Sequence, residues 1–376
     1  MSSRTAVPLE DACLAIVDCE HKTAPVDPAG DHFAVGTPAM VGNRIDFTAA
    51  RRISRETFDN WTRRLRPRFD DLLLAREAPV GPIVCIPESE NVAPGQRTVL
   101  LRSNPNVADP RYLYYLLSSP RQQEALKLKA AGSTVSHLNV ADVRTFPVEL
   151  PCLSEQRAVA ALLGALDDKI AADGQLAAVA RELTAVEFAA IEEISSTVCP
   201  LGAVLRLEYG RALPAPQRVP GAVSVVGSGG VVGTHDTSWL DGPGVVVGRK
   251  GSVGATYWQS DRFFPIDTTY YVVPQRSAIT MMYCYHLLKN TDLASLNSDS
   301  AVPGLNRTEA YATPVRVPAD DLIGRVSERG MHLFSLADRH DAESAALATL
   351  RDTLLPELIS GRLRVKDAEK QVEDVL

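Results

Sequence analysis

The sequence predicts an α+β protein built as a pseudo-twofold tandem repeat, in which two similar mixed α/β domains are each followed by a long helix. Three observations lead to this prediction. Four segments of the first half recur in the second half in the same order. Short strand-like runs bounded by Gly and Pro alternate with short helical segments in each domain. Each domain is followed by a segment of about 40 residues with helical periodicity and no strand signal.

The repeat is the strongest of these observations, because a fixed offset between several matches is the mark of a duplication. Any one of the matches alone would be weak. The matched pairs, at offsets of 167 to 173 residues, are LLLAREAPVG (72–81) with VVVGRKGSVG (245–254), YLYYLLSS (112–119) with YCYHLLKN (283–290), GSTVSHLNVADVRTFPVELP (132–151) with DSAVPGLNRTEAYATPVRVP (299–318), and 165–183 with 336–354.

The domain boundaries follow from prolines and helix-capping residues. Pro151 ends the first domain and Ser154 can cap the helix that follows, while Pro318 precedes the second long helix. The predicted segments are domain 1 (1–152), a central spacer helix (153–199), domain 2 (200–318), and a distal spacer helix with a C-terminal tail (319–376).

Apolar residues at alternating steps of three and four along both long helices predict a coiled-coil seam. The helical segments are acidic, with 8 acidic and 3 basic residues in 153–199 and 12 acidic and 8 basic residues in 319–376, which suits a solvated spacer. The predicted seam residues are Leu163, Leu166, Ile170, Leu176, Val179, Leu183 and Val186 in the first helix, and Leu333, Leu336, Leu347, Leu350 and Leu354 in the second, where His340 and Glu343 interrupt the pattern.

Composition excludes several classes of protein. No run of about 18 apolar residues predicts a membrane-spanning helix, and the first 22 residues lack the apolar core of a signal peptide. The six cysteines are scattered without a C-x-x-C pair, so neither a disulfide framework nor a zinc site is expected. We therefore expect a cytoplasmic protein that does not associate with membranes.

The glycine-rich and polar motifs do not match known catalytic patterns. GRKGSVG (248–254) lacks the G-K-[ST] end of a phosphate-binding loop, and GSGGVVG (227–233) lacks the spacing of a dinucleotide fingerprint. No methyltransferase loop, nuclease carboxylate cluster, metal-ligand spacing or Ser/His/Asp arrangement was found. The sequence thus predicts no catalytic residue, no metal site and no enzyme activity of its own.

A basic stretch points instead to a polyanion. Residues 51–69 contain seven arginines against Glu56 and Asp59, although a solvated helix with i,i+4 ion pairs would have the same composition. Two similar domains separated by long helices suit a ligand with two spaced half-sites, and duplex DNA is the commonest such ligand.

Five segments resemble one family over nearly the whole chain. CLSEQRAVAALLGALDDKI (152–170) and LRDTLLPELISGRLRV (350–365) resemble the central and closing signatures of the specificity (S) subunit of type I restriction–modification enzymes. DCEHKTAP (18–25) resembles the start of its first target-recognition domain, with Cys19 where glycine is usual, and GRKGSVG…FFPIDTTYYV and AVPGLNR resemble the second. In the first domain, Arg76, Glu77 and Ala78 stand against Arg249, Lys250 and Gly251 of the second.

The resemblance implies a non-catalytic subunit for DNA recognition in phage defence. Each target-recognition domain would read one half of a split double-stranded DNA target. The helices would form an antiparallel coiled coil that docks two DNA methyltransferase (modification) subunits. S-adenosylmethionine and ATP/Mg would be bound by partner subunits, the latter by restriction subunits, and no cofactor by this chain. The alternative is a scaffold or regulatory protein on the same fold that does not read sequence.

Side chains that suit phosphates and base edges were chosen as candidate DNA-binding residues. Asn139 and Asn306 recur in both halves and could instead hold a turn. The candidates are His21, Lys22, Arg51, Arg52, Arg63, Arg64 and Arg76 in the first domain, and Ser228, His235, Arg249, Lys250, Asn306 and Arg307 in the second.

Overall fold

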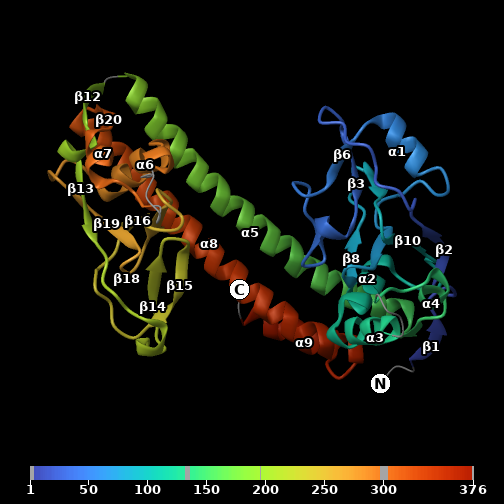
Figure 1. Ribbon diagram of the computed structural model, residues 1–376. Helices are drawn as coiled ribbons and strands as arrows, with labels where there is room; N and C mark the ends of the chain where they lie inside the picture. The colour runs from blue at the N-terminus through green and yellow to red at the C-terminus, as the bar shows by residue number, and fades with distance from the viewer. Residues whose placement is uncertain (1–3, 132–135, 195, 297–303, 375–376) are drawn as a thin grey trace. The chain divides into compact units, whose positions relative to one another are not determined.

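The computed structural model describes residues 4–131, 136–194, 196–296 and 304–374 (Figure 1). The chain divides into two compact units, of which unit 1 is Met1–Ala171 with Ser344–Leu376 and unit 2 is Ala172–Glu343. Each unit contains one mixed α/β domain, called head 1 (residues 4–152) and head 2 (residues 196–318) below, together with part of both long helices.

Head 1 is built on a four-stranded antiparallel sheet in the order β2-β10-β7-β8. A three-stranded sheet, β6-β3-β9, and the pairs β4-β5 and β1-β11 complete it. The elements are β1 (Thr5–Pro8), β2 (Cys13–Asp18), β3 (His32–Val35), β4 (Met40–Val41), β5 (Arg44–Ile45), β6 (Arg51–Ile53), α1 (Arg55–Trp61), β7 (Leu72–Arg76), β8 (Val80–Cys85), β9 (Val92–Pro94), β10 (Thr98–Ser103), α2 (Pro110–Ser118), α3 (Pro120–Ala130), α4 (Val140–Arg144) and β11 (Pro147–Leu150).

Head 2 repeats the four-stranded sheet, the three-stranded sheet and the terminal strand pair of head 1, whereas the pair β4-β5 has no counterpart in the described part of head 2. Its four-stranded sheet has the order β13-β19-β16-β17, and β14 pairs in parallel with β18 as β3 does with β9. This agreement confirms the tandem repeat of two mixed α/β domains. The elements are β12 (Ser196–Pro200), β13 (Leu205–Tyr209), β14 (Val223–Gly227), β15 (Gly230–His235), β16 (Gly244–Gly248), β17 (Thr256–Gln259), β18 (Phe263–Pro265), β19 (Thr269–Pro274), α6 (Met281–Asn290), α7 (Arg307–Ala312) and β20 (Pro314–Pro318).

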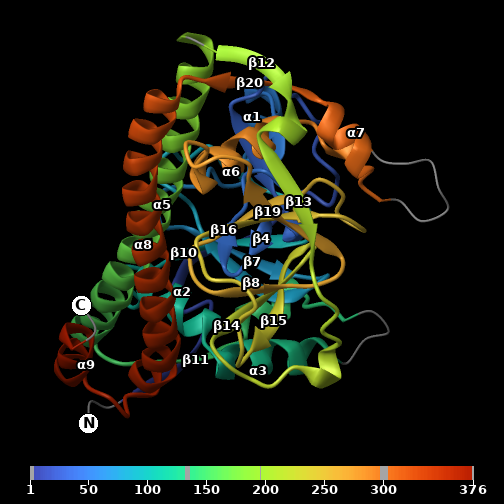
Figure 2. The same ribbon diagram turned by 90° about the vertical axis from the view of Figure 1, so that its left-hand side faces the viewer.

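Two long helices pack side by side in antiparallel directions within each unit, as predicted (Figures 1 and 2). They are α5 (Leu153–Ile194) and α8 (Asp320–Ser360), and a short helix, α9 (Val365–Glu373), follows α8. In unit 2, Arg181 of α5 pairs with Asp338 of α8 at 3.0 Å. The helical conformation of α5 stops at Ile194, and the last residues of the segment expected to be helical, 196–199, lie in β12.

The coiled-coil seam predicted for the second part of α5 is wrong. Leu176, Val179, Leu183 and Val186 are 46–58% exposed, and the neighbouring positions are buried instead. The buried positions hold small residues, and Ala177 and Ala180 of α5 form one buried cluster with Ala337 of α8. Heptad spacing alone gives a periodicity but does not identify which of two adjacent stripes faces the partner helix. In the first part of α5, Leu163, Leu166 and Ile170 are buried as expected.

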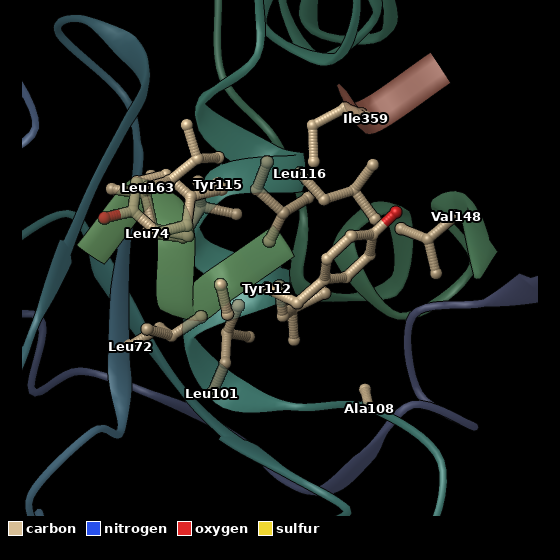
Figure 3. Packing of buried hydrophobic residues seen from close by; sticks show 14 of the residues in the cluster. Leu72, Leu74, Leu101, Ala108, Tyr112, Tyr115, Leu116, Val148, Leu163 and Ile359 are labelled. Carbon is tan, nitrogen blue, oxygen red and sulfur yellow. The ribbon is translucent and has the colours of Figure 1, made fainter. Parts of the chain in front are cut away.

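The core of unit 1 joins head 1 to both long helices. Leu163 of α5 and Ile359 of α8 belong to the same buried cluster as Leu74, Tyr112 and Leu116 of head 1 (Figure 3). These are large apolar side chains removed from water, which is the main favourable contribution to folding. The first long helix is therefore part of the core of head 1 and is more than a spacer.

Gln156 in the CLSEQR motif ties α5 to head 1 through buried hydrogen bonds. Its Oε1 accepts from the Asp109 N–H at 2.9 Å, and its Nε2 donates to the carbonyls of Val107 and Pro151 at 3.0 and 2.8 Å. The residue is only 1% exposed. We expect Gln156→Leu to lower the free energy of unfolding by about 2 kcal/mol, because it leaves buried backbone groups without partners. Urea unfolding of the full chain measures this, with Arg157→Leu, one residue along on the exposed face, as the control that should change little. Equal free energies of unfolding for the two variants would contradict this role for Gln156.

Candidate nucleic-acid interface

The two glycine-containing segments that match across the repeat are hairpin loops at equivalent places in the two heads. In head 1 the loop joins β7 to β8, and in head 2 it joins β16 to β17. The carbonyl of Arg76 accepts from the Leu138 N–H, and the carbonyl of Arg249 accepts from the Leu305 N–H, both at 2.9 Å. The same backbone contact in both heads places the candidates of each loop beside the segment that carries Asn139 or Asn306.

The loop of head 2 is a tight turn that requires glycine. Gly251 and Gly254 have φ values of +80° and +76°, a region that other residues rarely adopt. A Cβ on Gly254 would also lie 2.8 Å from the Ala294 nitrogen. The loop therefore brings two chain segments together. Arg249 and Lys250 are its first residues and lie next to these segments.

Arginines from two segments of head 2 converge on one tyrosine ring. The guanidinium carbons of Arg249 and Arg307 lie 5.3 and 5.0 Å from the ring centroid of Tyr209, which is 49% exposed. Arg249 donates to the carbonyl of Asp267 at 2.7 Å, and Arg307 donates to the carbonyl of Leu207 at 3.3 Å. Figure 2 shows α7, which carries Arg307, beside β13, which ends at Tyr209.

Asn306 is a helix cap. Its Oδ1 accepts from the backbone N–H groups of Thr308 and Glu309 at 3.1 and 3.3 Å, at the start of α7. Asn139 occupies the corresponding position before α4, where its own N–H donates to Asp142 at 3.3 Å. The recurrence of asparagine in both halves is thus explained by helix capping. A base contact for Asn306 stays a prediction.

Four of the seven candidates in head 1 are paired with two carboxylates, one at the end of β2 and one two residues later. Arg76 is 8% exposed and lies 2.7 Å from Asp18, which also contacts His21 at 3.0 Å. Glu20 lies 2.9 Å from Arg63 and 3.7 Å from Arg64. The two pairs with Glu20 offset part of the positive charge that the basic stretch 51–69 was expected to present.

The other three candidates of head 1 lie on exposed surface. Arg52 stacks over Phe33 at 5.6 Å, and its neighbour Arg51 lines a cavity of about 180 Å³ together with Gln96 and Arg97. Lys22 is exposed in the segment after β2. Contacts of these residues with DNA remain predictions.

Ser228 lies against the glycine loop of head 2, since a Cβ on Gly251 would be 3.2 Å from its Oγ, whereas His235 lies at the end of β15. The Nδ1 atom of His235 accepts from the Val219 N–H at 3.0 Å, and its ring packs edge-on against Phe264 at 6.0 Å. The carbonyl of Ser228 accepts from the Tyr257 hydroxyl at 3.2 Å. These contacts are structural, and a DNA contact by either residue stays a prediction.

Sequence reasoning missed the aromatic partners of the arginines. Tyr209 and Tyr311 lie under Arg307, and Trp239 lies 4.4 Å from the guanidinium carbon of Arg211. The segment EYGRALP (208–214) places an aromatic residue two positions from an arginine, which was the available signal. Stacked guanidinium groups keep their charge and most of their donors, so such pairs suit the recognition of phosphate.

Burial makes three of the six cysteines poor nucleophiles. Burial raises the pKa of Cys13, Cys85 and Cys284 to about 12, so these thiols stay protonated near neutral pH. In the described part of the chain, the group with possible metal-ligand geometry is Asp173, His340 and Glu343, and His340 is 2.9 Å from Asp173 in an ion pair between the long helices.

Comparisons with known proteins agree with the resemblance seen in the sequence. Residues 64–180 match the family model for the type I restriction modification DNA specificity domain. The matched family is one of DNA-recognition domains, in agreement with the prediction of a non-catalytic recognition subunit. No curated protein sequence matches the chain significantly.

A solved structure of a type I restriction–modification S subunit from M. genitalium superposes with a TM-score of 0.69 at 18% identity, covering 95% of this chain and 96% of that one. An HsdS subunit from Thermoanaerobacter tengcongensis covers 96% of the chain at 17% identity, but its TM-score of 0.38 is too low to support an argument. None of the helices in the described part of the chain has the length and hydropathy to cross a membrane. The chain has the fold of a type I specificity subunit, and its residues 64–180 match the type I restriction modification DNA specificity domain.

Proposed function

We propose that this chain is the sequence-reading subunit of a type I restriction–modification complex and recognises a bipartite DNA target, with one half-site per head. The observation that supports this most strongly is the repeat of the two main sheets in both heads, with the equivalent loops at 76–80 and 248–256 in the same backbone setting. A protein with internal pseudo-twofold symmetry suits a duplex with two spaced half-sites. The two heads differ in sequence, so the two halves of the target would differ as well.

The second part of the proposal is that the long helices dock two DNA methyltransferase subunits. The exposed stripe of Leu176, Val179, Leu183 and Val186 supports it, because four large apolar side chains on one face of α5 are left uncovered by α8. Such a stripe at helical spacing is typical of a surface that receives another helix. The methyltransferase subunits would supply S-adenosylmethionine, and restriction subunits would supply ATP/Mg chemistry, in the cytoplasm.

Co-purification tests this proposal. The full chain, expressed with the modification subunit encoded beside it, should form a complex that methylates duplex DNA at a split site. The double variant Leu176→Ser/Leu183→Ser should lose the complex, while Glu182→Ser, on the exposed surface of the same helix, should keep it. If the unaltered pair forms no complex and methylates no split site, the proposed function is wrong.

A further inference from the structure

Equivalent arginines of the two heads face different partners. The strand register pairs Asp18 with Val99 in head 1 and Tyr209 with Tyr270 in head 2, so Asp18 and Tyr209 occupy equivalent positions. Arg76 ends β7, and Arg249 directly follows the equivalent strand, β16. A carboxylate therefore faces the arginine in head 1, at 2.7 Å, where a tyrosine ring faces it in head 2, at 5.3 Å.

At two further equivalent positions, head 2 is also more positively charged than head 1. Glu77 in head 1, which lies 3.4 Å from Arg97, corresponds to Lys250 in head 2, and both form a backbone bridge to the facing segment. Val140, the residue after the cap Asn139, corresponds to Arg307, the residue after Asn306.

The charges around the β7–β8 loop of head 1 cancel, whereas those around the β16–β17 loop of head 2 do not. Asp18 and Glu77 pair with Arg76 and Arg97. Across the ranges that the structure describes, no carboxylate forms an ion pair with Arg249, Lys250 or Arg307. A tyrosine ring orients a guanidinium group without neutralising it, and two guanidinium groups within 5.3 Å of the same ring centroid repel each other unless an anion lies between them.

We infer that Arg249 and Arg307, held on Tyr209, bind backbone phosphate of duplex DNA, and that the equivalent place in head 1 makes no phosphate contact. The inference rests on the proposed function, since it concerns how the two heads hold the same duplex. Phosphate is the ligand that the chemistry selects, because guanidinium donors in a fixed orientation match its oxygens, and phosphate contacts position a protein without reading bases. Head 2 would thus supply more of the salt-dependent affinity than head 1.

The test measures how DNA binding depends on salt in the complex of the full chain with its modification subunits. Each phosphate neutralised contributes about −0.9 to the slope of log Kobs against log [salt]. Arg249→Gln and Arg307→Gln should each make the slope less steep by about 1, with the preference for the target over unrelated duplex unchanged. Arg97→Gln, the exposed member of the head 1 cluster, should leave the slope unchanged.

Arg325→Gln on α8, whose side chain is 69% exposed, serves as the control for removal of a surface charge. A slope that stays the same in Arg249→Gln and Arg307→Gln, or that falls equally in Arg97→Gln, would overturn the inference while the proposed function stands. A complex of the unaltered chain that binds no DNA would overturn both. Because all three test arginines are partly exposed, complex formation by each variant checks that its fold is intact.

Discussion

Asp167→Asn is expected to lower the free energy of unfolding of unit 1 by about 3 kcal/mol, since it removes the carboxylate from a partly buried network. Asp167 accepts from Arg351 of α8 at 2.6 Å, from Arg44 of head 1 at 3.0 Å, and from the Tyr115 hydroxyl of α2 at 2.7 Å. One carboxylate thus joins both long helices to head 1. Asparagine keeps the size and one acceptor oxygen, but it removes the negative charge that faces two guanidinium groups and replaces the oxygen that accepts from Tyr115 with an amide donor.

The adjacent residue offers a matched control. Asp168 is exposed, and we expect Asp168→Asn to change the free energy of unfolding by less than about 0.5 kcal/mol. Urea unfolding of the full chain, monitored by circular dichroism, should show the first transition at a lower urea concentration for Asp167→Asn only. If the two variants unfold alike, Asp167 does not have the structural role that its contacts indicate.

Lowering the pH from about 6.5 to 4 is expected to destabilise unit 2 by up to about 3 kcal/mol through His286. This residue of α6 is 4% exposed and stacks on Phe188 of α5, with ring centroids 4.7 Å apart. Burial, with a smaller effect of Lys289, lowers the pKa of His286 to about 4. The unfolded chain, with an ordinary histidine pKa near 6.5, binds the proton more readily. The contribution to stability is therefore full above pH 6.5, falls as the pH drops through this window, and levels off below 4.

The variant His286→Leu removes the titrating group and keeps an apolar side chain. The difference in unfolding free energy between pH 7 and pH 4.5 should be smaller in His286→Leu than in the unaltered chain. His332→Leu, at an exposed position of α8, should leave that difference as it is. Parallel pH profiles for the unaltered chain and His286→Leu would show that the imidazole does not carry the effect.

The sequence predicted the structural elements that depend on the order and spacing of residues along the chain. The glycine loop of head 2, the long helices and the repeat of the heads all follow from residue order, because turns, helical periodicity and duplication are visible along the chain. The polar residues of the CLSEQRAVAALLGALDDKI motif also have a physical explanation. Gln156 and Asp167 both hold α5 against head 1 through partly or fully buried contacts.

Long-range pairing was not predictable in the same way. The charge of the basic stretch depends on Glu20, which precedes it by some 30 residues and pairs with Arg63 and Arg64 only in the folded protein. In unit 2, the face of α5 that packs on α8 carries Ala177 and Ala180 and not the larger apolar side chains. Which heptad stripe is buried depends on the partner helix, and spacing within one helix carries no information about it.

Mapping methylated adenines in cells with and without this chain tests the central claim most directly. Loss of the chain should abolish methylation at one split motif, and exchange of residues 200–318 for those of another specificity subunit should change one half of that motif while the other half persists. A methylome that is the same with and without the chain would contradict sequence reading and would favour a scaffold on the same fold.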